Sequence, residues 1–195
     1  MQFIWELHLE MLIRLCSSSQ TRAMLLTQAG IDFIQESVDF DEENIVASSP
    51  KNFVYQATMG KYEANVKAFG YKDYPLLVAD TVVTSQGHIL RKARCKDDAR
   101  NILMTQSGNI TSIITCLIYH SKEKKIIDIS QTDYLFDDFN EDALEKYLDS
   151  GEWRGKAGAC MVEGFCKSYI KEVKGFESTA MGLSVEVLQT FREKS

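Results

Sequence analysis

The chain has 195 residues, of which 45% are hydrophobic and 26% are charged. It can therefore build one sizeable core or two lobes that share a cleft, but not two independent large domains. The formal net charge of -6 argues against a binder of duplex nucleic acid, which needs a basic stripe to displace counterions from phosphates. A single nucleotide stays compatible with this charge, because a few local cations are enough to bind it.

The first ten residues, MQFIWELHLE, lack the basic segment and the small-residue cleavage site of a secretion signal. We interpret residues 1–10 as an extension or a misassigned start, and residues 11–195 as a single domain. No apolar run reaches the roughly 20 residues needed to span a bilayer, so we expect no membrane partner.

Residues 12–26 read LIRLCSSSQTRAMLL, which predicts a short strand, three serines and the start of a helix. Free N–H groups at such a break point at one spot, and the helix dipole favours an anion there. Arg22 adds a guanidinium group suited to phosphate. The competing interpretation is a serine N-cap on an ordinary strand–helix unit, so this stretch alone does not decide.

Further elements alternate along the chain. A helix is predicted over 21–28, a strand over 31–37, an acidic loop over 38–44, and a helix from Pro50 to about Phe69. Later elements are a buried strand within 74–84 that ends at the charged Asp80, a helix over 97–106, strands over 109–120 and 126–136, a helix over 140–150, a strand over 165–173 and a last helix capped by Ser184. This alternation predicts an α/β fold, and the short turn after residue 120 requires an antiparallel pair, so the sheet is mixed.

Cysteines and histidines constrain the chemistry. The cysteines are Cys16, Cys95, Cys116, Cys160 and Cys166. They form no CxxC pair and mostly lie in apolar runs, so we expect buried free thiols and a reducing cytosol. The three histidines have no metal-ligand spacing, which argues against zinc hydrolysis and histidine-based catalysis. Any metal is therefore expected to be held by oxygen.

Asp80 is the sharpest single candidate for chemistry. An acid inside an apolar strand is costly unless it is paired, bound to a metal or at the exposed end of the strand. Open α/β sheets place ligands at the carboxyl ends of strands, and a structural salt bridge or cap is the alternative. The acidic loop 38–44 could supply an oxygen ligand to Mg²⁺ together with Asp80, although most such loops are simply solvated. The chain has neither a P-loop nor a GxGxxG turn.

Four motifs in order, LCSSSQTRAMLL, ADTVV, SGEWRGKAGACMVEG and STAMGLSVEVL, resemble the Maf family of nucleoside triphosphate pyrophosphatases. The resemblance covers nearly all of residues 11–191. It implies a mixed twisted sheet with flanking helices, in two lobes around a cleft as in inosine triphosphatase. It also implies a cytoplasmic enzyme that cleaves a nucleoside triphosphate to the monophosphate and pyrophosphate with a divalent metal, Mg²⁺ or Mn²⁺, a homodimer, and a link to septum formation.

The resemblance assigns roles to individual residues. Asp80 matches the acid of the ADT motif and is expected to accept a proton, with Glu42 as its partner in holding the metal. Phosphate-contacting positions match Ser17, Ser19, Arg22, Lys61 and Lys92. Positions linked to the choice of base match Thr21, Thr81 and Glu163. We expect Arg22, Glu42, Asp80 and Glu163 to line one cleft.

The positions linked to base choice disagree with one another. Thr81 resembles the branch that acts on dTTP and UTP, Glu163 resembles the branch that acts on 7-methyl-GTP, and Thr21 matches neither. An ionised Glu163 accepts hydrogen bonds but cannot donate them, which favours a base edge that presents donors, such as a guanine edge. Base specificity therefore stays open.

Departures from the family pattern keep two alternatives in view. Gln20 replaces a proline, Thr21 replaces the first arginine, Met24 replaces a glutamate, and Lys92 lacks its usual following proline. A nucleotide-binding regulator of cell division that has lost catalysis would tolerate these changes, although a binder alone has no need of Asp80. The other alternative is a phosphate-binding α/β domain of unrelated function.

Overall fold

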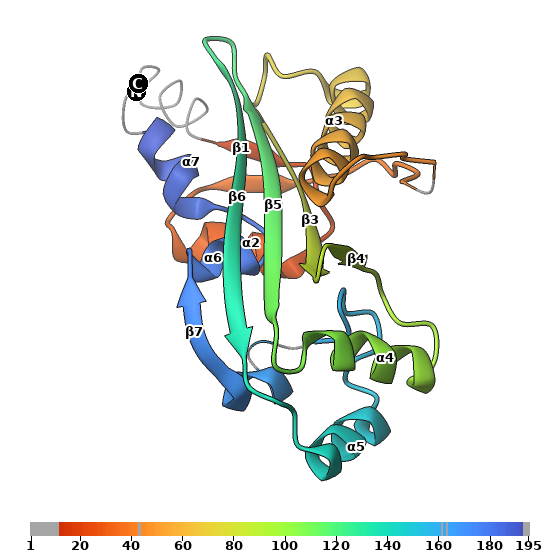
Figure 1. Cartoon of the computed structure of the whole chain (residues 1–195). Coiled ribbons are helices and arrows are strands. Elements are labelled where there is room, and N and C mark those ends of the chain that lie inside the picture. Colours follow the sequence, from red (N-terminus) through yellow and green to blue (C-terminus); the bar gives the residue numbers. More distant parts are fainter. Residues whose placement is uncertain (1–11, 43, 161, 163, 193–195) are drawn as a thin grey trace. The chain divides into compact units, whose positions relative to one another are not determined.

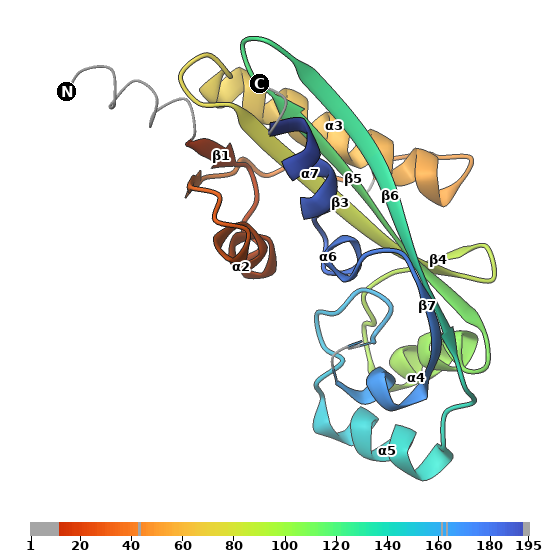
Figure 2. The ribbon, with the colours of Figure 1, turned by 90° about the vertical axis from the view of Figure 1, so that its left-hand side faces the viewer.

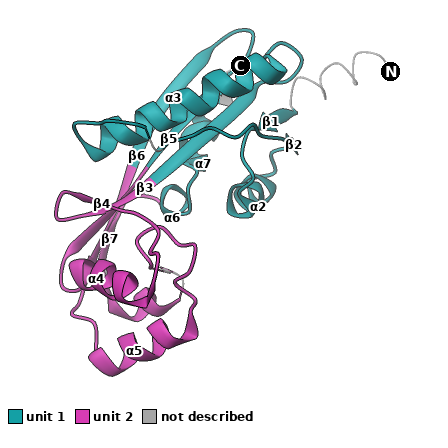
Figure 3. Cartoon of the chain, turned by 90° about the vertical axis from the view of Figure 1, so that its right-hand side faces the viewer, with its two compact units in different colours: residues 1–81, 115–130, 177–195 teal, residues 82–114, 131–176 magenta. Residues whose placement is uncertain are grey.

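The computed structural model describes residues 12–42, 44–160, 162 and 164–192; the predicted extension over residues 1–10 lies outside them. The chain divides into two compact units (Figure 3). Unit 1 comprises residues 1–81, 115–130 and 177–195, and unit 2 comprises residues 82–114 and 131–176. A single domain over 11–195 and a cleft between two lobes stay predictions.

Within the described residues, seven strands form one mixed sheet in the order β2-β1-β3-β5-β6-β7, with β4 paired to β3 off this path (Figure 1). The strands are β1 (Ile13–Leu15), β2 (Phe33–Gln35), β3 (Leu76–Ser85), β4 (His88–Leu90), β5 (Ile110–His120), β6 (Lys125–Phe136) and β7 (Ile170–Lys174). β1 is parallel to β2 and β3, whereas the β3–β4 and β6–β7 pairs are antiparallel. The predicted α/β fold with a mixed sheet is confirmed.

Unit 1 packs helices on both faces of β1, β3 and β5 (Figure 2). Its helices are α2 (Gln20–Gln28), α3 (Pro50–Phe69), α6 (Glu177–Ala180) and α7 (Val185–Arg192). Leu77 and Ala79 of β3 belong to a buried cluster with α2 and α7, whereas Leu76 and Val78 belong to a cluster with α3. Because β3 is buried on both faces, its sequence is a nearly continuous apolar run. The predicted bounds of α2 and α3 are right to within one residue.

Unit 2 holds α4 (Lys96–Gln106), α5 (Glu141–Ser150), the 3₁₀ helix η1 (Phe165–Tyr169), β4 and β7. The strand predicted over 165–173 is wrong for its first five residues, which form η1. Phe165 and Tyr169 both pack edge-on against Phe139, with ring centroids 5.2 and 4.9 Å away. Hydrogen bonds between residues three apart close the turn, since the Lys167 N–H donates to the Gly164 carbonyl over 3.0 Å and the Ile170 N–H donates to the Lys167 carbonyl. Local hydrogen bonds and aromatic packing therefore accompany the 3₁₀ helix in this segment.

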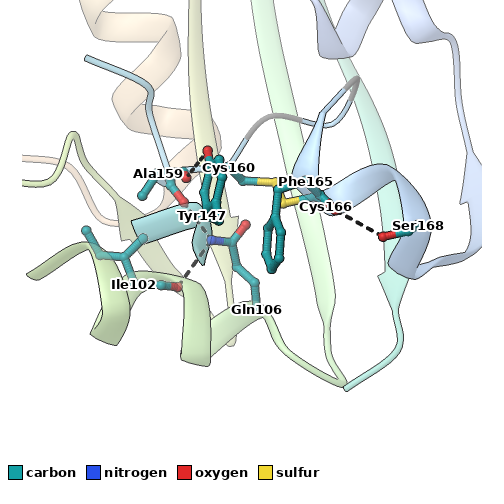
Figure 4. The surroundings of a disulfide bond; sticks show 9 residues. Ile102, Gln106, Tyr147, Ala159, Cys160, Phe165, Cys166 and Ser168 are labelled. Carbon is teal, nitrogen blue, oxygen red and sulfur yellow. Dashed lines mark hydrogen bonds between the residues drawn. A yellow bond between two sulfur atoms is a disulfide. The ribbon is translucent and has the colours of Figure 1, made fainter. Parts of the chain in front are cut away.

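Cys160 and Cys166 of unit 2 form a disulfide, so the expectation of free thiols is wrong for this pair (Figure 4). The bond lies among packed groups. The Phe165 ring stacks on Tyr147 with centroids 4.6 Å apart, and the Tyr147 hydroxyl donates to the Ala159 carbonyl over 3.0 Å. Cys16 and Cys116 are buried free thiols as predicted, and Cys95 is exposed.

No helix in the described part of the chain combines the length and the apolar composition that a bilayer-crossing segment requires.

Candidate active site

The serine-rich turn after β1 is held in a fixed shape by its own side chains. The Ser19 hydroxyl accepts a hydrogen bond from the Arg22 backbone N–H over 3.3 Å, and the Ser17 hydroxyl accepts one from the Ser19 N–H over 3.2 Å. The Gln35 amide donates to the backbone carbonyls of Ser17 and Ser19. Ser19 is therefore an N-cap, and the turn is rigid before any ligand arrives.

The Arg22 guanidinium group is anchored on three sides. Its Nε donates to the Gly182 carbonyl over 2.8 Å, Nη1 donates to the Ser17 hydroxyl over 3.0 Å, and Nη2 donates to the Thr81 hydroxyl over 3.3 Å. A guanidinium group carries five N–H donors. Among the described residues, one N–H on Nη1 and one on Nη2 have no further partner. These two N–H groups are left to donate to phosphate oxygens.

Burial lowers the pKa of the Arg22 guanidinium, and the negative charges of Asp80 and Glu42 oppose this effect. Arginine stays charged even so, because its ordinary pKa lies far above neutral pH. The charges of Asp80 and Glu42 weaken the attraction of Arg22 for a distant anion. At contact, where water is excluded, the attraction between Arg22 and an anion is strong. Arg22 is therefore suited to a bound phosphate.

Lys61 of α3 links two carboxylates. Its Nζ lies 2.9 Å from Asp80 Oδ1 and also forms an ion pair with Glu42 Oε1. The Asp80 side chain is 11% exposed, so the ion pair compensates a charge that burial would otherwise make costly. The salt bridge that the sequence left as the alternative for Asp80 is thus present.

Asp80 lies in the middle of β3, so the prediction that the strand ends there is wrong. β3 continues past Asp80 because β4 pairs with it at Val83, Thr84 and Ser85, whereas β1 pairs with β3 only at Leu76 and Leu77. Beyond that level β3 continues without β1 beside it, and the serine-rich turn begins. The charged residue therefore lies past the carboxyl end of a parallel strand, where α/β sheets bind ligands.

Gly60, in the middle of α3, makes room for the loop that carries Glu42. A Cβ atom on Gly60 would overlap the Phe40 ring. Glycine inside a helix costs about 1 kcal/mol relative to alanine. This cost is offset by the close approach of Phe40, which holds Glu42, two residues further on, beside Lys61.

We expect Gly60→Ala to destabilise the protein by about 1–2 kcal/mol, because overpacking the Phe40 ring outweighs the gain in helix propensity. The displaced loop should also lower kcat/KM about tenfold, since Glu42 would leave Lys61. Urea unfolding and steady-state kinetics measure the two effects. Lys67→Ala, on the exposed surface of the same helix, is the control. A variant more stable than the wild type would contradict this role of Gly60.

A pocket of approximately 310 Å³ lies in unit 1 at the end of β1. Its lining residues are Cys16, Ser17, Ser18, Ser19, Arg22, Ser37, Val38, Asp39, Phe40, Glu42, Lys61 and Ala79. Burial raises the pKa of the Cys16 thiol to about 12, so this thiol stays protonated and is not a nucleophile. The remaining polar lining has four serine hydroxyls, two cations and two carboxylates, Asp39 and Glu42, a set that suits a phosphate bound together with a metal cation.

The structure brings together most of the site residues expected from the sequence. Ser17, Ser19, Arg22, Glu42 and Lys61 all line the pocket. Asp80 is connected to the pocket through Lys61, and Thr81 through Arg22. The Asp80 and Thr81 side chains start from opposite faces of β3, because consecutive residues of a strand point to alternate faces.

Two other expected residues, Thr21 and Lys92, are not part of the pocket lining. Thr21 is exposed at the start of α2. Lys92 belongs to unit 2, where it forms a β-bridge with Ala157. Glu163 lies outside the described residues, so its place in a shared cleft stays a prediction.

Sequence reasoning missed the groups that hold Arg22 and the serine turn. Gly182 lies 160 residues from Arg22, and Gln35 lies 18 residues from Ser17. No local pattern marks such contacts. The only available signal was the position of Gly182 inside the STAMGLSVEVL motif.

Carboxylates that could hold a metal are few in this site. No group of three or more His, Cys, Asp or Glu side chains suited to a metal occurs among the described residues. Glu42 and Asp80 are two oxygen donors joined by one lysine. Mg²⁺ is commonly held by one or two carboxylates together with substrate phosphates and water, so this pair fits a metal that arrives with a triphosphate.

Comparison with known proteins gives consistent results. Residues 12–194 match the family model for Maf-like proteins. A nucleoside triphosphate pyrophosphatase of a Nitratiruptor species is 57% identical over 179 residues, which cover 91% of this chain and 96% of the relative.

Proteins with the same name are similar to this chain in two further genera. The one from Campylobacter jejuni (strain 81-176) is 37% identical, over 91% of this chain and 98% of the relative. The one from Helicobacter pylori (strain J99) is 38% identical, over 88% and 90%. With the family model matching nearly the whole described chain, the protein belongs to the Maf family.

Proposed function

We propose that this chain hydrolyses a nucleoside triphosphate to the monophosphate and pyrophosphate. The observation that carries the proposal is the cluster at the end of β1, where Arg22 and Lys61 line one pocket and Lys61 pairs with Glu42 and Asp80. The name shared by the similar proteins supports the same reaction. Phosphoryl transfer needs mainly positioning and charge stabilisation, which this cluster offers.

Each residue of the cluster has a distinct part in the proposed reaction. The serine turn and the two remaining N–H groups of Arg22 bind phosphate oxygens. A water molecule attacks the α-phosphorus, the α–β phosphoanhydride bond breaks, and pyrophosphate leaves with the electron pair of that bond. Asp80 accepts the proton of the attacking water, while Lys61 fixes the orientation of the Asp80 carboxylate.

A divalent cation, Mg²⁺ or Mn²⁺, would be held by Glu42 and Asp80 together with the triphosphate. When bound, it supplies positive charge that neutralises the phosphate oxygens. Glu42 and Asp80 are suited to this because carboxylates are the ligands that hard cations prefer.

The base would be chosen by Thr21, Thr81 and Glu163, as the family resemblance suggests. Glu163 carries the most specific expectation, because an ionised carboxylate only accepts hydrogen bonds. A base edge that presents donors, such as the guanine edge of 7-methyl-GTP, is then favoured over thymine or uracil. Lys92 is proposed as a further phosphate contact.

A cytoplasmic location, a homodimer and a link to septum formation complete the proposal. They are supported by the family resemblance alone. The substrate is a single nucleotide rather than a nucleic acid polymer, in keeping with the net charge of -6.

The test is pyrophosphate release from a panel of normal and modified nucleoside triphosphates with Mg²⁺ or Mn²⁺. We expect monophosphate and pyrophosphate in equal amounts, no orthophosphate, and a higher rate with 7-methyl-GTP than with dTTP or UTP. Chelation of the metal should abolish release. If the protein binds triphosphates but releases pyrophosphate from none of them, the proposed enzymatic activity is wrong. The catalytically impaired regulator of cell division is then favoured.

A further inference from the structure

We infer that Thr115, a residue of β5 outside the pocket, is a positioning residue that holds Arg22 ready for the triphosphate. The inference rests on the proposed function for its substrate, but not for its geometry. Thr115 is completely buried. Its Oγ1 lies 2.9 Å from Thr81 Oγ1 and 2.8 Å from the Thr179 carbonyl oxygen.

Counting hydroxyl protons fixes the direction of these hydrogen bonds. A threonine hydroxyl has one proton to donate, and Thr115 donates it to the Thr179 carbonyl. Thr81 must therefore donate its own proton to Thr115. Thr81 in turn accepts a hydrogen bond from Arg22 Nη2, so its hydroxyl faces Arg22 as an acceptor.

The same contacts close into a ring around Arg22. The Thr179 carbonyl accepts from Thr115 and also from the Gly182 backbone N–H, over 3.0 Å. The Gly182 carbonyl then accepts from Arg22 Nε. Starting at Arg22, the ring runs through Thr81, Thr115, Thr179 and Gly182 and returns to Arg22.

Gly182 completes this ring because of its conformation. Its φ of 102° lies in a region that L side chains rarely adopt, and a Cβ atom there would lie 3.3 Å from Thr81 Oγ1 and 3.4 Å from Arg22 Nε. Only a glycine lets its carbonyl approach Arg22 this closely. The ring therefore depends on one glycine and one buried hydroxyl.

The ring gives Thr81 and Thr115 a role in affinity for phosphate. A preoriented guanidinium group loses less conformational entropy when it binds than a free one does. Because the only proton of Thr81 is used within the protein, Thr81 cannot donate a hydrogen bond to a base. Thr81 therefore orients Arg22, and a base can contact the Thr81 hydroxyl only by donating a hydrogen bond to it.

The test uses Thr115→Val, which removes the hydroxyl while keeping the shape of the side chain. We expect about a tenfold rise in KM for the triphosphate and about a tenfold weaker Kd for inorganic tripolyphosphate, measured by calorimetry, with kcat changed less. Thr115→Ser should restore both values. Thr111→Val is the matched control: Thr111 is buried on the same strand, and its hydroxyl has no partner among the described residues.

A double-mutant cycle separates positioning from a merely structural effect. If Thr115 acts through Arg22, Thr115→Val should not weaken tripolyphosphate binding further in an Arg22→Lys background. The inference is overturned if Thr115→Val weakens tripolyphosphate binding by the same factor with Arg22→Lys as without it. It is also overturned if Thr115→Val alone binds tripolyphosphate as tightly as the wild type. If Thr115→Val fails to fold by circular dichroism, Thr81→Val breaks the same ring at Arg22 and must show the same loss.

The experiments distinguish failure of the proposed function from failure of the inference about Thr115. A wild-type protein that releases no pyrophosphate from any triphosphate would end the proposed reaction. Tripolyphosphate binding that still depends on Thr115 and Arg22 would support the ring independently.

Discussion

Asp80→Asn is expected to lower kcat by about a thousandfold while the protein still binds its triphosphate. Asparagine has the size of aspartate and keeps an oxygen that can accept the hydrogen bond from Lys61 Nζ, 2.9 Å away. It carries no negative charge and does not accept the proton of the attacking water. The lost function is therefore chemical, and Lys61 keeps Glu42 as an ion-pair partner.

Single-turnover pyrophosphate release and equilibrium binding of the triphosphate measure the two quantities separately. Asp128→Asn serves as the matched control, because Asp128 is a partly buried acid of unit 1 on β6, outside the pocket lining. That variant should keep kcat within about twofold, as surface and partly buried sites away from the chemistry usually do. Unchanged turnover in Asp80→Asn would remove Asp80 from its role.

Local signals in the sequence located α2 and α3 of unit 1 accurately, whereas α6 was not predicted. Ser19 and Ser49 cap α2 and α3 through their hydroxyl groups, and a serine followed by proline at the first helical position is visible without any structure. The apolar run of β3 was equally plain, because burial on both faces requires it. These features depend only on residues close in sequence.

Features that depend on distant contacts could not be predicted in the same way. Asp80 lies inside β3 but past the end of its neighbour β1, and nothing near Asp80 reports where β1 stops. Likewise the alternation in the sequence gave no indication of η1, whose Phe165 and Tyr169 pack on Phe139. Tertiary packing overrode the local pattern at both places.

The residues of the site show the same contrast between local signals and distant contacts. The family resemblance identified Arg22, Lys61, Glu42 and Asp80 as site residues. In the structure, Arg22, Lys61 and Glu42 line the pocket of unit 1, and Asp80 pairs with Lys61. One of the groups that orient Arg22, the Gly182 carbonyl, comes from the other end of the chain. Motifs name the residues that touch a ligand more readily than those that hold them in place, because positioning groups such as the Gly182 carbonyl and the Gln35 amide lie far away in the sequence or make contacts that no local pattern marks.

Arg22→Lys is expected to lower kcat/KM for the triphosphate by about a hundredfold, or about 2.7 kcal/mol of transition-state stabilisation. Lysine keeps the positive charge, but one ammonium group cannot replace a planar fork that donates to Ser17, Thr81 and Gly182 at once. Those three acceptors would lose their donor, and the two further guanidinium N–H groups would no longer be present for the phosphate.

Arg14→Lys is the matched control for this substitution, since Arg14 is a partly buried arginine of β1 that pairs with Glu36 over 2.8 Å and is not among the residues that line the pocket. Both variants lose a guanidinium group, so a similar loss of stability in urea is expected for each, whereas only Arg22→Lys should lose affinity for the triphosphate. A kcat/KM within threefold of the wild type would show that charge alone suffices at this position. The fixed fork, rather than the charge, is what the serine turn, Thr81 and Gly182 are arranged to hold.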